Sequence, residues 1–164
     1  MLVRKIDFYT DGAYSSATKM GGWASICVED NRLIDSQMGY ESNTTNNRME
    51  LTAFLSALNT AEHIETRNAQ ISIHTDSAYI ANAINQRWLF NWRSNGWKTS
   101  DKREVKNQDL WLAILAAYIR VSSKFTQFEV IKVKAHSTNK WNNVADLFAV
   151  KARMRNPETK EVLE

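Results

Sequence analysis

The sequence has 164 residues, of which 43% are hydrophobic and 24% are charged. A chain of this length and composition is expected to fold as one domain with a substantial buried core. No apolar run approaches the roughly 20 residues that cross a membrane, and the N-terminus becomes polar too early for a signal peptide. The single cysteine, Cys27, excludes an internal disulfide, so we expect a cytoplasmic enzyme or binding module. The formal charge of +3 hints at an anionic partner.

In chain order, the first three predicted elements are strands. Residues 3–10 alternate apolar and polar side chains and lead into the sequence TDG, which predicts the end of the first strand. Two further strands are predicted over 21–30 and 32–40, and the turn-forming residues between them predict a hairpin. A helix follows over 46–64, with Thr44, Thr45 or Asn46 as its N-cap.

The later part of the chain alternates helices with two more strands. The predicted elements are a strand over 69–77, a short helix beginning over 78–84, an apolar helix over 109–119, a strand over 128–136 and a closing helix over 139–154. This order predicts an α/β fold in which a five-stranded mixed sheet is flanked by helices. We expect one domain over residues 1–155, with no separate domain before it, and a flexible tail over 156–164.

Four acidic residues stand where a core would not require them. Asp11 and Asp76 each follow a threonine at the C-terminal end of a predicted strand, and such ends meet at one edge of an open α/β sheet. Glu50 lies near the start of the helix predicted over 46–64, and Asp146 interrupts the most apolar part of the last helix. Each has a simpler explanation: turn or cap residues at the strand ends, a glutamate favoured by the helix dipole, and a solvated helix face.

Taken together, the four acids could surround one point and hold metal ions. Oxygen ligands in this number suit Mg²⁺ or Mn²⁺, and nothing in the sequence suits zinc. Carboxylates this close would otherwise repel one another, and a pair of divalent cations removes that penalty. Two such ions are a known means of phosphodiester hydrolysis, because one activates water and the other stabilises the leaving oxygen.

His136 is the candidate proton carrier among three histidines. It stands in a polar loop ten residues before Asp146, and an imidazole can transfer a proton to a departing alkoxide or product. An exposed loop histidine with no role is the alternative. His63, at a helix end, and His74, in a strand, are expected to be structural or exposed.

Residues 84–106, here called the basic segment, are rich in basic and aromatic side chains. The segment carries six Lys or Arg residues against two acids, and it holds Trp88, Trp92 and Trp97, half of the six tryptophans. Basic side chains neutralise phosphates and exposed indoles stack on bases, so the segment predicts nucleic-acid binding. The alternative is that Trp88 and Trp92, four residues apart, bury one face of a helix.

These motifs together resemble type 1 ribonuclease H. The sequences TDG, TNNRMEL, TDS and GWKTSDKREVKNQDLW, and a histidine ten residues before the aspartate of the last helix, follow the family's order over about Ile6 to Arg153. TDG or TDS alone would be unspecific, but the combination is specific. The resemblance implies a ribonuclease H-like fold and an endonuclease that uses two Mg²⁺ ions, with Mn²⁺ able to substitute. Its substrate would be the RNA strand of an RNA–DNA hybrid, cut to leave 3′-hydroxyl and 5′-phosphate ends.

The resemblance also assigns residues. The family's catalytic, metal-binding acids and its loop histidine correspond to Asp11, Glu50, Asp76, Asp146 and His136. The side-chain amides of Asn46 and Asn47 resemble those that read the RNA strand, whose 2′-hydroxyl can both donate and accept hydrogen bonds. The residues that the resemblance places against the DNA strand or its phosphates are Thr45, Trp88, Asn91, Trp92, Lys98 and Asn107. We expect a monomer with no obligate protein partner and no membrane association.

One motif residue and several departures from the family pattern bear on binding. Arg48 either contacts a phosphate or forms a structural ion pair that braces the acids, and we favour the ion pair. Ala78 stands where a substrate-contacting glutamine is usual, and Asn43 where an arginine often supports the phosphate pocket. Ser94 and Asn95 replace basic residues of many relatives. These departures predict weaker and more salt-sensitive binding with the chemistry intact.

Three other interpretations were weighed. An inactive relative could bind nucleic acid without cutting it, but the presence of all four acids argues against this. Another nuclease of the same superfamily, such as a Holliday-junction resolvase or a transposase-type domain, is disfavoured by the context of Glu50 and by the tryptophan-rich basic segment. A phosphotransfer domain using Asp11 would need a second nearby aspartate, which the sequence DGA lacks.

Overall fold

The computed structural model describes residues 3–135 and 137–155. The strands are β1 (Arg4–Ser15), β2 (Met20–Glu29), β3 (Arg32–Glu41), β4 (Ala69–Thr75) and β5 (Gln127–Lys132). The helices of the described part are α1 (Asn46–Glu62), α2 (Ala78–Asn85), α3 (Trp88–Asn95), α4 (Gln108–Lys124) and α5 (Lys140–Met154). The predicted elements occur in the predicted order, and α3 is a helix for which no range was predicted. His136 and the predicted tail over 156–164 lie outside the described residues.

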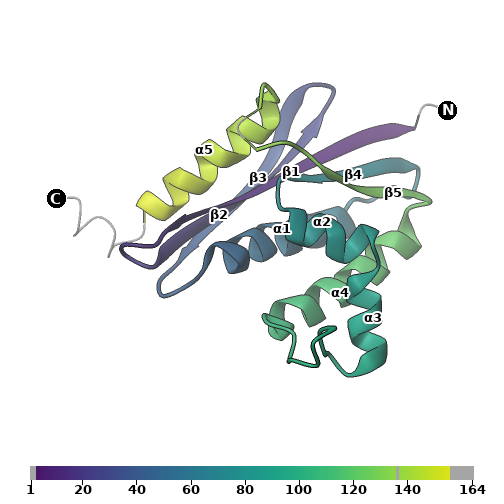
Figure 1. The fold of residues 1–164 in the computed structure, drawn as a ribbon. Coiled ribbons are helices and arrows are strands. Elements are labelled where there is room, and N and C mark those ends of the chain that lie inside the picture. The colour runs from purple at the N-terminus through teal and green to yellow at the C-terminus, as the bar shows by residue number, and fades with distance from the viewer. Residues whose placement is uncertain (1–2, 136, 156–164) are drawn as a thin grey trace.

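The five strands form one mixed sheet in the order β3-β2-β1-β4-β5 (Figure 1). β1 and β3 pair antiparallel with β2, whereas β4 pairs parallel with both β1 and β5. The predicted hairpin joins β2 to β3 through Asp30 and Asn31, whose φ angles of 53° and 58° are left-handed. Asp and Asn tolerate this conformation better than most residues, which explains their place in the turn. The predicted five-stranded mixed sheet is confirmed.

Helices cover the sheet on both faces because adjacent residues of β1 point to opposite sides. Phe8 packs in one core cluster with Leu51 of α1, and Tyr9 packs in another with Ala145 of α5. Figure 1 shows α5 on one side of the sheet, with α1 and α4 on the other. Both helices that carry a predicted catalytic acid, α1 and α5, therefore pack directly on the central strands.

Three helices begin with a side-chain cap. The Oγ1 atom of Thr45 accepts a hydrogen bond from the backbone N–H of Arg48 at 3.2 Å, so Thr45 is the N-cap of α1 among the three predicted candidates. Ser77 caps α2, and Asn139 caps α5 in the same way. Such caps satisfy backbone N–H groups that the first helical turn leaves without a partner.

The predicted strand ends needed correction. β1 does not end at TDG but continues to Ser15, because its antiparallel partner β2 accompanies it to the pair Ser15–Met20. Only the parallel pairing with β4 stops there, at the pair Thr10–Thr75. β4 ends at Thr75 because Ser77 is needed as a helix cap, and β5 ends at Lys132, before the predicted residue 136. Across residues 3–135 and 137–155, none of the helices combines the length and apolar character required to span a membrane.

Candidate active site

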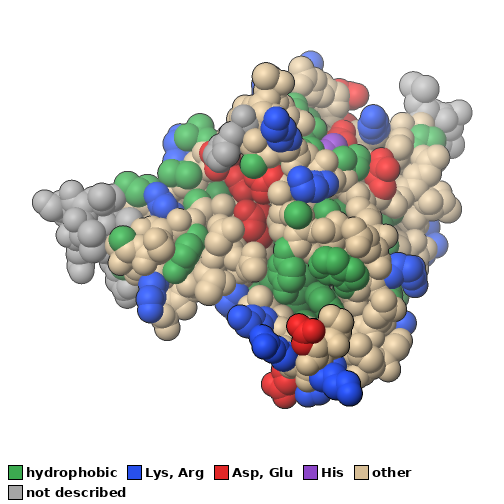
Figure 2. Space-filling view, viewed as in Figure 1, with side chains coloured by type: hydrophobic (Ala, Val, Ile, Leu, Met, Phe, Trp, Pro, Cys, Tyr) green, Lys and Arg blue, Asp and Glu red, His purple; other side chains and the backbone are tan. Residues whose placement is uncertain are grey.

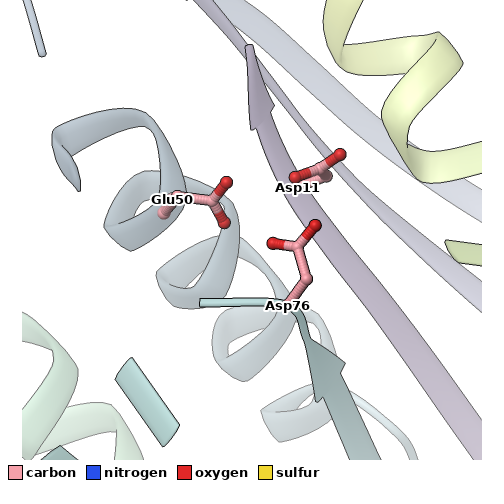
Figure 3. A group of neighbouring side chains, drawn as sticks. All are labelled: Asp11, Glu50 and Asp76. Carbon is pink, nitrogen blue, oxygen red and sulfur yellow. The ribbon is translucent and has the colours of Figure 1, made fainter. Parts of the chain in front are cut away.

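Two of the predicted acids lie where the parallel pairing of β1 and β4 stops. Asp11 is the first residue of β1 beyond the last parallel pair, and Asp76 directly follows Thr75, the last residue of β4. Glu50 faces them from the N-terminal part of α1, which packs on β1. One carboxylate oxygen from each of the three acids lies within 4.8 Å of the others, and their carboxylates point toward one another (Figure 3).

Gly12 joins two of these acids through its backbone. Its N–H group donates to Oδ1 of Asp11 at 3.0 Å and to Oε1 of Glu50 at 3.1 Å. A Cβ atom at this position would lie 2.8 Å from the backbone nitrogen of Glu50 and 2.8 Å from the Cβ of Met49. Only glycine therefore lets α1 approach β1 this closely. Gly12 was not predicted to have a role, although the glycine of TDG was its signal in the sequence.

The electrostatics of the group oppose full ionisation. Asp11 and Glu50 are only 4% and 5% exposed. Burial, followed by the charges of Glu50 and Asp76, raises the pKa of Asp11 well above its ordinary value. Burial and the charge of Asp76 likewise raise the pKa of Glu50. The Oε2 atom of Glu50 is buried and has no hydrogen-bond partner among the described residues. Three carboxylates, two of them buried, are thus brought close together, and this raises the cost of ionising them all.

The fourth predicted acid, Asp146, lies at the rim of the same hollow. It is half-buried on α5 and contributes to the raised pKa of Asp11, but it is not part of the group within 4.8 Å. The hollow has a volume of about 420 Å³. Its lining residues are Asp11, Gly12, Asn46, Asn47, Glu50, Asp76, Ser77, Ala78, Tyr79, Ala135 and Asp146. Tyr79 is a lining residue that the sequence analysis missed. Figure 2 shows the acidic side chains gathered in this part of the surface.

The two predicted RNA-reading amides are placed beside the acids. Asn46 and Asn47 begin α1, are exposed and line the hollow. Because Glu50 lies one turn further along the same helix, the motif TNNRMEL brings amides and carboxylate to one surface.

The basic segment forms a second hollow of about 490 Å³. Its lining residues are Trp88, Asn91, Trp92, Asn95, Lys98, Thr99 and Ser100, which include four of the predicted DNA-strand residues. The indole of Trp92 packs edge-on against buried Trp111 at 5.5 Å between ring centres, whereas Trp88 is 36% exposed. The alternative of a buried helix face holds only in part, because Trp92 is half-buried against the core and still lines the hollow, and Trp88 is available at the surface. Figure 2 shows apolar and then basic side chains below the acidic patch, over α3 and the loop toward α4.

Arg48 forms the favoured ion pair, but its partner differs from the expected one. Its guanidinium binds both carboxylate oxygens of Asp109 in α4, at 3.0 and 2.7 Å. The expectation that it braces the catalytic acids was wrong, because Asp109 lies outside their group. Asn107, a predicted phosphate-binding residue, also accepts a hydrogen bond from Arg48 at 3.3 Å.

Two histidines have structural surroundings, as expected. The Nε2 atom of His74 lies 2.9 Å from Oδ1 of Asp7, and its ring stacks on Tyr9 at 4.2 Å. His63 is the C-cap residue of α1, and its Nδ1 atom lies 2.7 Å from the carbonyl oxygen of Asn59. His136, the predicted catalytic histidine, lies outside the described residues.

The fold, the acidic group at the sheet edge and the adjacent basic segment define a nuclease. Comparison with known proteins identifies which kind. The model of the family described as RNase H matches residues 4–154. The chain belongs to the ribonuclease H family. It is accordingly an enzyme, an endonuclease that acts on RNA–DNA hybrids.

Curated relatives agree over most of their length. A ribonuclease H from Caldicellulosiruptor saccharolyticus is 43% identical over 147 residues, covering 90% of this chain and 94% of the relative. One from Chlorobium luteolum is 38% identical over 154 residues, covering 94% and 99%.

Solved structures support the fold. LC9-RNase H1, described as a type 1 RNase H with the type 2 active-site motif, aligns with a TM-score of 0.75 at 24% identity over 93% of this chain and 74% of that one. The PFV RNase H domain aligns with a TM-score of 0.74 at 23% identity, over 93% and 96%. The predicted ribonuclease H-like fold is thereby confirmed.

Proposed function

We propose that the chain cuts the RNA strand of an RNA–DNA hybrid with two divalent cations held by Asp11, Glu50, Asp76 and Asp146. The products would carry 3′-hydroxyl and 5′-phosphate ends. The observation that carries the proposal is the group of three carboxylates within 4.8 Å at the sheet edge, with the fourth on the rim of the same hollow.

The residues of this group fit hard divalent cations. They offer carboxylate oxygens alone, the donors that Mg²⁺ prefers and that Mn²⁺ also accepts. The buried Oε2 atom of Glu50 has no hydrogen-bond partner within residues 3–135 and 137–155, and the raised pKa values of Asp11 and Glu50 indicate a site where a cation would favour the ionised carboxylates. Bound there, such cations would supply an activated water and neutralise charge on the leaving oxygen.

The chain's own residues would orient the hybrid around this centre. Asn46 and Asn47, exposed beside the acids, can donate to and accept from the 2′-hydroxyl of the RNA strand. The backbone N–H of Gly12 keeps the carboxylates of Asp11 and Glu50 in place. We assign proton transfer to the departing product to His136, as a proposal from the sequence alone.

The DNA strand is proposed to lie against the hollow of the basic segment. The exposed indole of Trp88 offers a stacking surface, and Asn91, Trp92 and Lys98 line the same hollow. Thr45 and Asn107 are proposed to bind one DNA phosphate. A strand held in this way would present its RNA partner to the acids.

Cleavage of labelled duplexes tests the proposal. End-labelled RNA–DNA hybrid is incubated with Mg²⁺ and then with EDTA, beside duplex RNA, duplex DNA and each single strand. We expect cleavage of only the RNA strand of the hybrid, with none in EDTA. Hybrid binding without cleavage would support the inactive-module alternative, and cleavage of DNA would support another nuclease branch.

We further propose that residues 1–155 act as a single domain and a monomer in the cytoplasm. A chain with a single cysteine has no internal disulfide that would require an oxidising compartment, and burial raises the pKa of the Cys27 thiol to about 12. Size-exclusion chromatography with light scattering tests the monomer; a dimer mass would contradict it.

A further inference from the structure

Arg48 contacts both residues of the proposed DNA-phosphate site. Its backbone N–H donates to Oγ1 of Thr45 at 3.2 Å, and its Nη1 atom donates to Oδ1 of Asn107 at 3.3 Å. Thr45 precedes α1 and Asn107 precedes α4, so one residue links two helix starts that are far apart in sequence.

Asp109 fixes the direction of the guanidinium. Its two carboxylate oxygens accept hydrogen bonds from the two terminal nitrogens of Arg48, from Nη1 at 3.0 Å and from Nη2 at 2.7 Å. A planar guanidinium held by such a fork has one orientation, whereas a single contact would let it rotate. The third contact of Arg48, to Asn107, is therefore also fixed in direction.

Asn107 is held in a conformation that leaves its amide group for another partner. It occupies the N-cap position of α4 with φ 62° and ψ 33°, in the left-handed region, and its side chain does not cap the helix. Its Oδ1 atom instead accepts from Arg48, so its Nδ2 donors point to the other side of the amide. Thr45 also keeps a donor for another partner. Its Oγ1 atom accepts a hydrogen bond from the backbone N–H of Arg48, so its hydroxyl hydrogen remains available to donate.

From this arrangement we infer that the Arg48 side chain is a positioning group, locked by Asp109, that aims the Nδ2 donors of Asn107 at the DNA phosphate proposed to be shared with Thr45. The inference rests on the proposed function, since it deepens the binding of the same hybrid. In this inference Arg48 acts through Asn107, because three of its N–H donors are directed at Asp109 and Asn107.

The same two helices supply a matched control. Arg120 of α4 donates from Nε to Oε1 of Glu62 of α1 at 2.7 Å, forming a second partly exposed ion pair between α1 and α4. Glu62→Ala and Asp109→Ala each remove one carboxylate that ties these helices together, but only the second releases Arg48. Effects of general loosening or lost charge should therefore be common to both variants.

The first test is a comparison of kcat and KM on an RNA–DNA hybrid. We expect Asp109→Ala to raise KM about three- to tenfold with little change in kcat, since it removes binding shared by ground and transition states. Glu62→Ala should leave KM at the wild-type value. Arg48→Lys should raise KM like Asp109→Ala, because one ammonium group keeps the charge but cannot hold Asp109 and Asn107 together.

The sign of the Asp109→Ala effect separates positioning from direct contact. If Arg48 bound the phosphate itself, releasing it from Asp109 would leave KM unchanged or lower it, and Arg48→Lys would keep most of the affinity. Either result, or a fall in kcat at constant KM, would overturn the inference.

Replacing one DNA phosphate at a time by an uncharged analogue shows which phosphate the protein contacts at this site. Hybrids with a single methylphosphonate at successive DNA positions should show one position at which wild type loses affinity. That loss should disappear in Asp109→Ala and persist in Glu62→Ala. Its persistence in both would overturn the inference. Because dissociation constants can be measured in EDTA, this scan still tests the positioning role if wild type cleaves no hybrid, an outcome that would instead refute the proposed function.

Discussion

Replacing Asp11 by asparagine should stabilise the fold in EDTA while it abolishes cleavage. Two unit charges 4.8 Å apart repel by about 3.5 kcal/mol at an effective dielectric constant of about 20. The acidic group relieves part of this repulsion by keeping a proton, as the raised pKa values of Asp11 and Glu50 require. We therefore expect the free energy of unfolding to rise by about 1–2 kcal/mol at pH 7, which is about 2–8 °C in Tm for a chain of this size.

The pH dependence follows from the direction of the pKa shifts. Asp11 and Glu50 have folded-state pKa values above their ordinary values of 3.8 and 4.5. As pH rises above about 4, the unfolded chain releases these protons before the folded chain does, so the folded chain binds more protons and loses stability. In EDTA the Tm of wild type should fall from this region up to the raised pKa values. Asp11→Asn should show a shallower fall, and Mg²⁺ should stabilise wild type much more than the variant.

Thermal melts over a pH series, with EDTA or Mg²⁺, measure these effects beside hybrid cleavage. Asp35→Asn is the control, because it removes a similar carboxylate at an exposed position of β3. A Tm of Asp11→Asn at or below wild type in EDTA at neutral pH, with an unchanged pH slope, would refute the repulsion argument. Cleavage by Asp11→Asn at the wild-type rate would refute the metal-site assignment.

Two further predictions concern the tryptophans and the packing of α5. Trp88→Ala should raise KM for the hybrid without lowering Tm, because Trp88 is exposed, whereas Trp92→Ala should lower stability by about 2–4 kcal/mol through lost packing; equal Tm values would contradict this contrast. Gly22→Ala should lower both Tm and kcat, since its Cβ would lie 2.3 Å from the carbonyl oxygen of Ala149 in α5, the helix that carries Asp146. Wild-type melting and turnover of Gly22→Ala would show that α5 adapts freely.

Several features of the candidate active site could be predicted from short stretches of the sequence. The two threonine–aspartate pairs predicted that Asp11 and Asp76 lie together, and they do so where the parallel pairing of β1 and β4 stops, although β1 itself continues beyond Asp11. The polar run before α1 predicted both its cap and the amides beside Glu50, because three residues make nearly one helical turn.

Other features depended on residues distant in the chain. The partner of Arg48 is Asp109, 61 positions away, and no local pattern chooses it over the nearer acids. How far a tryptophan of the basic segment is exposed depends on Trp111 of α4, which packs against Trp92 and leaves Trp92 half-buried. The end of β1 was misplaced for the same reason, since its partner strand, and not its own residues, extends it to Ser15.

By itself, the sequence determined most of the elements, the starts of α1, α2 and α5 to within a residue or two, and which side chains can bind metal or nucleic acid, because these properties depend on residue type and short spacing. The tertiary structure decided how close the groups lie: three carboxylates within 4.8 Å, Asp146 at their rim, and Gly12 between β1 and α1. It also decided that Asp109 holds Arg48. Distances of this kind arise from the packing of α1, α4 and α5 on and beside the sheet, and packing is a property of the whole chain.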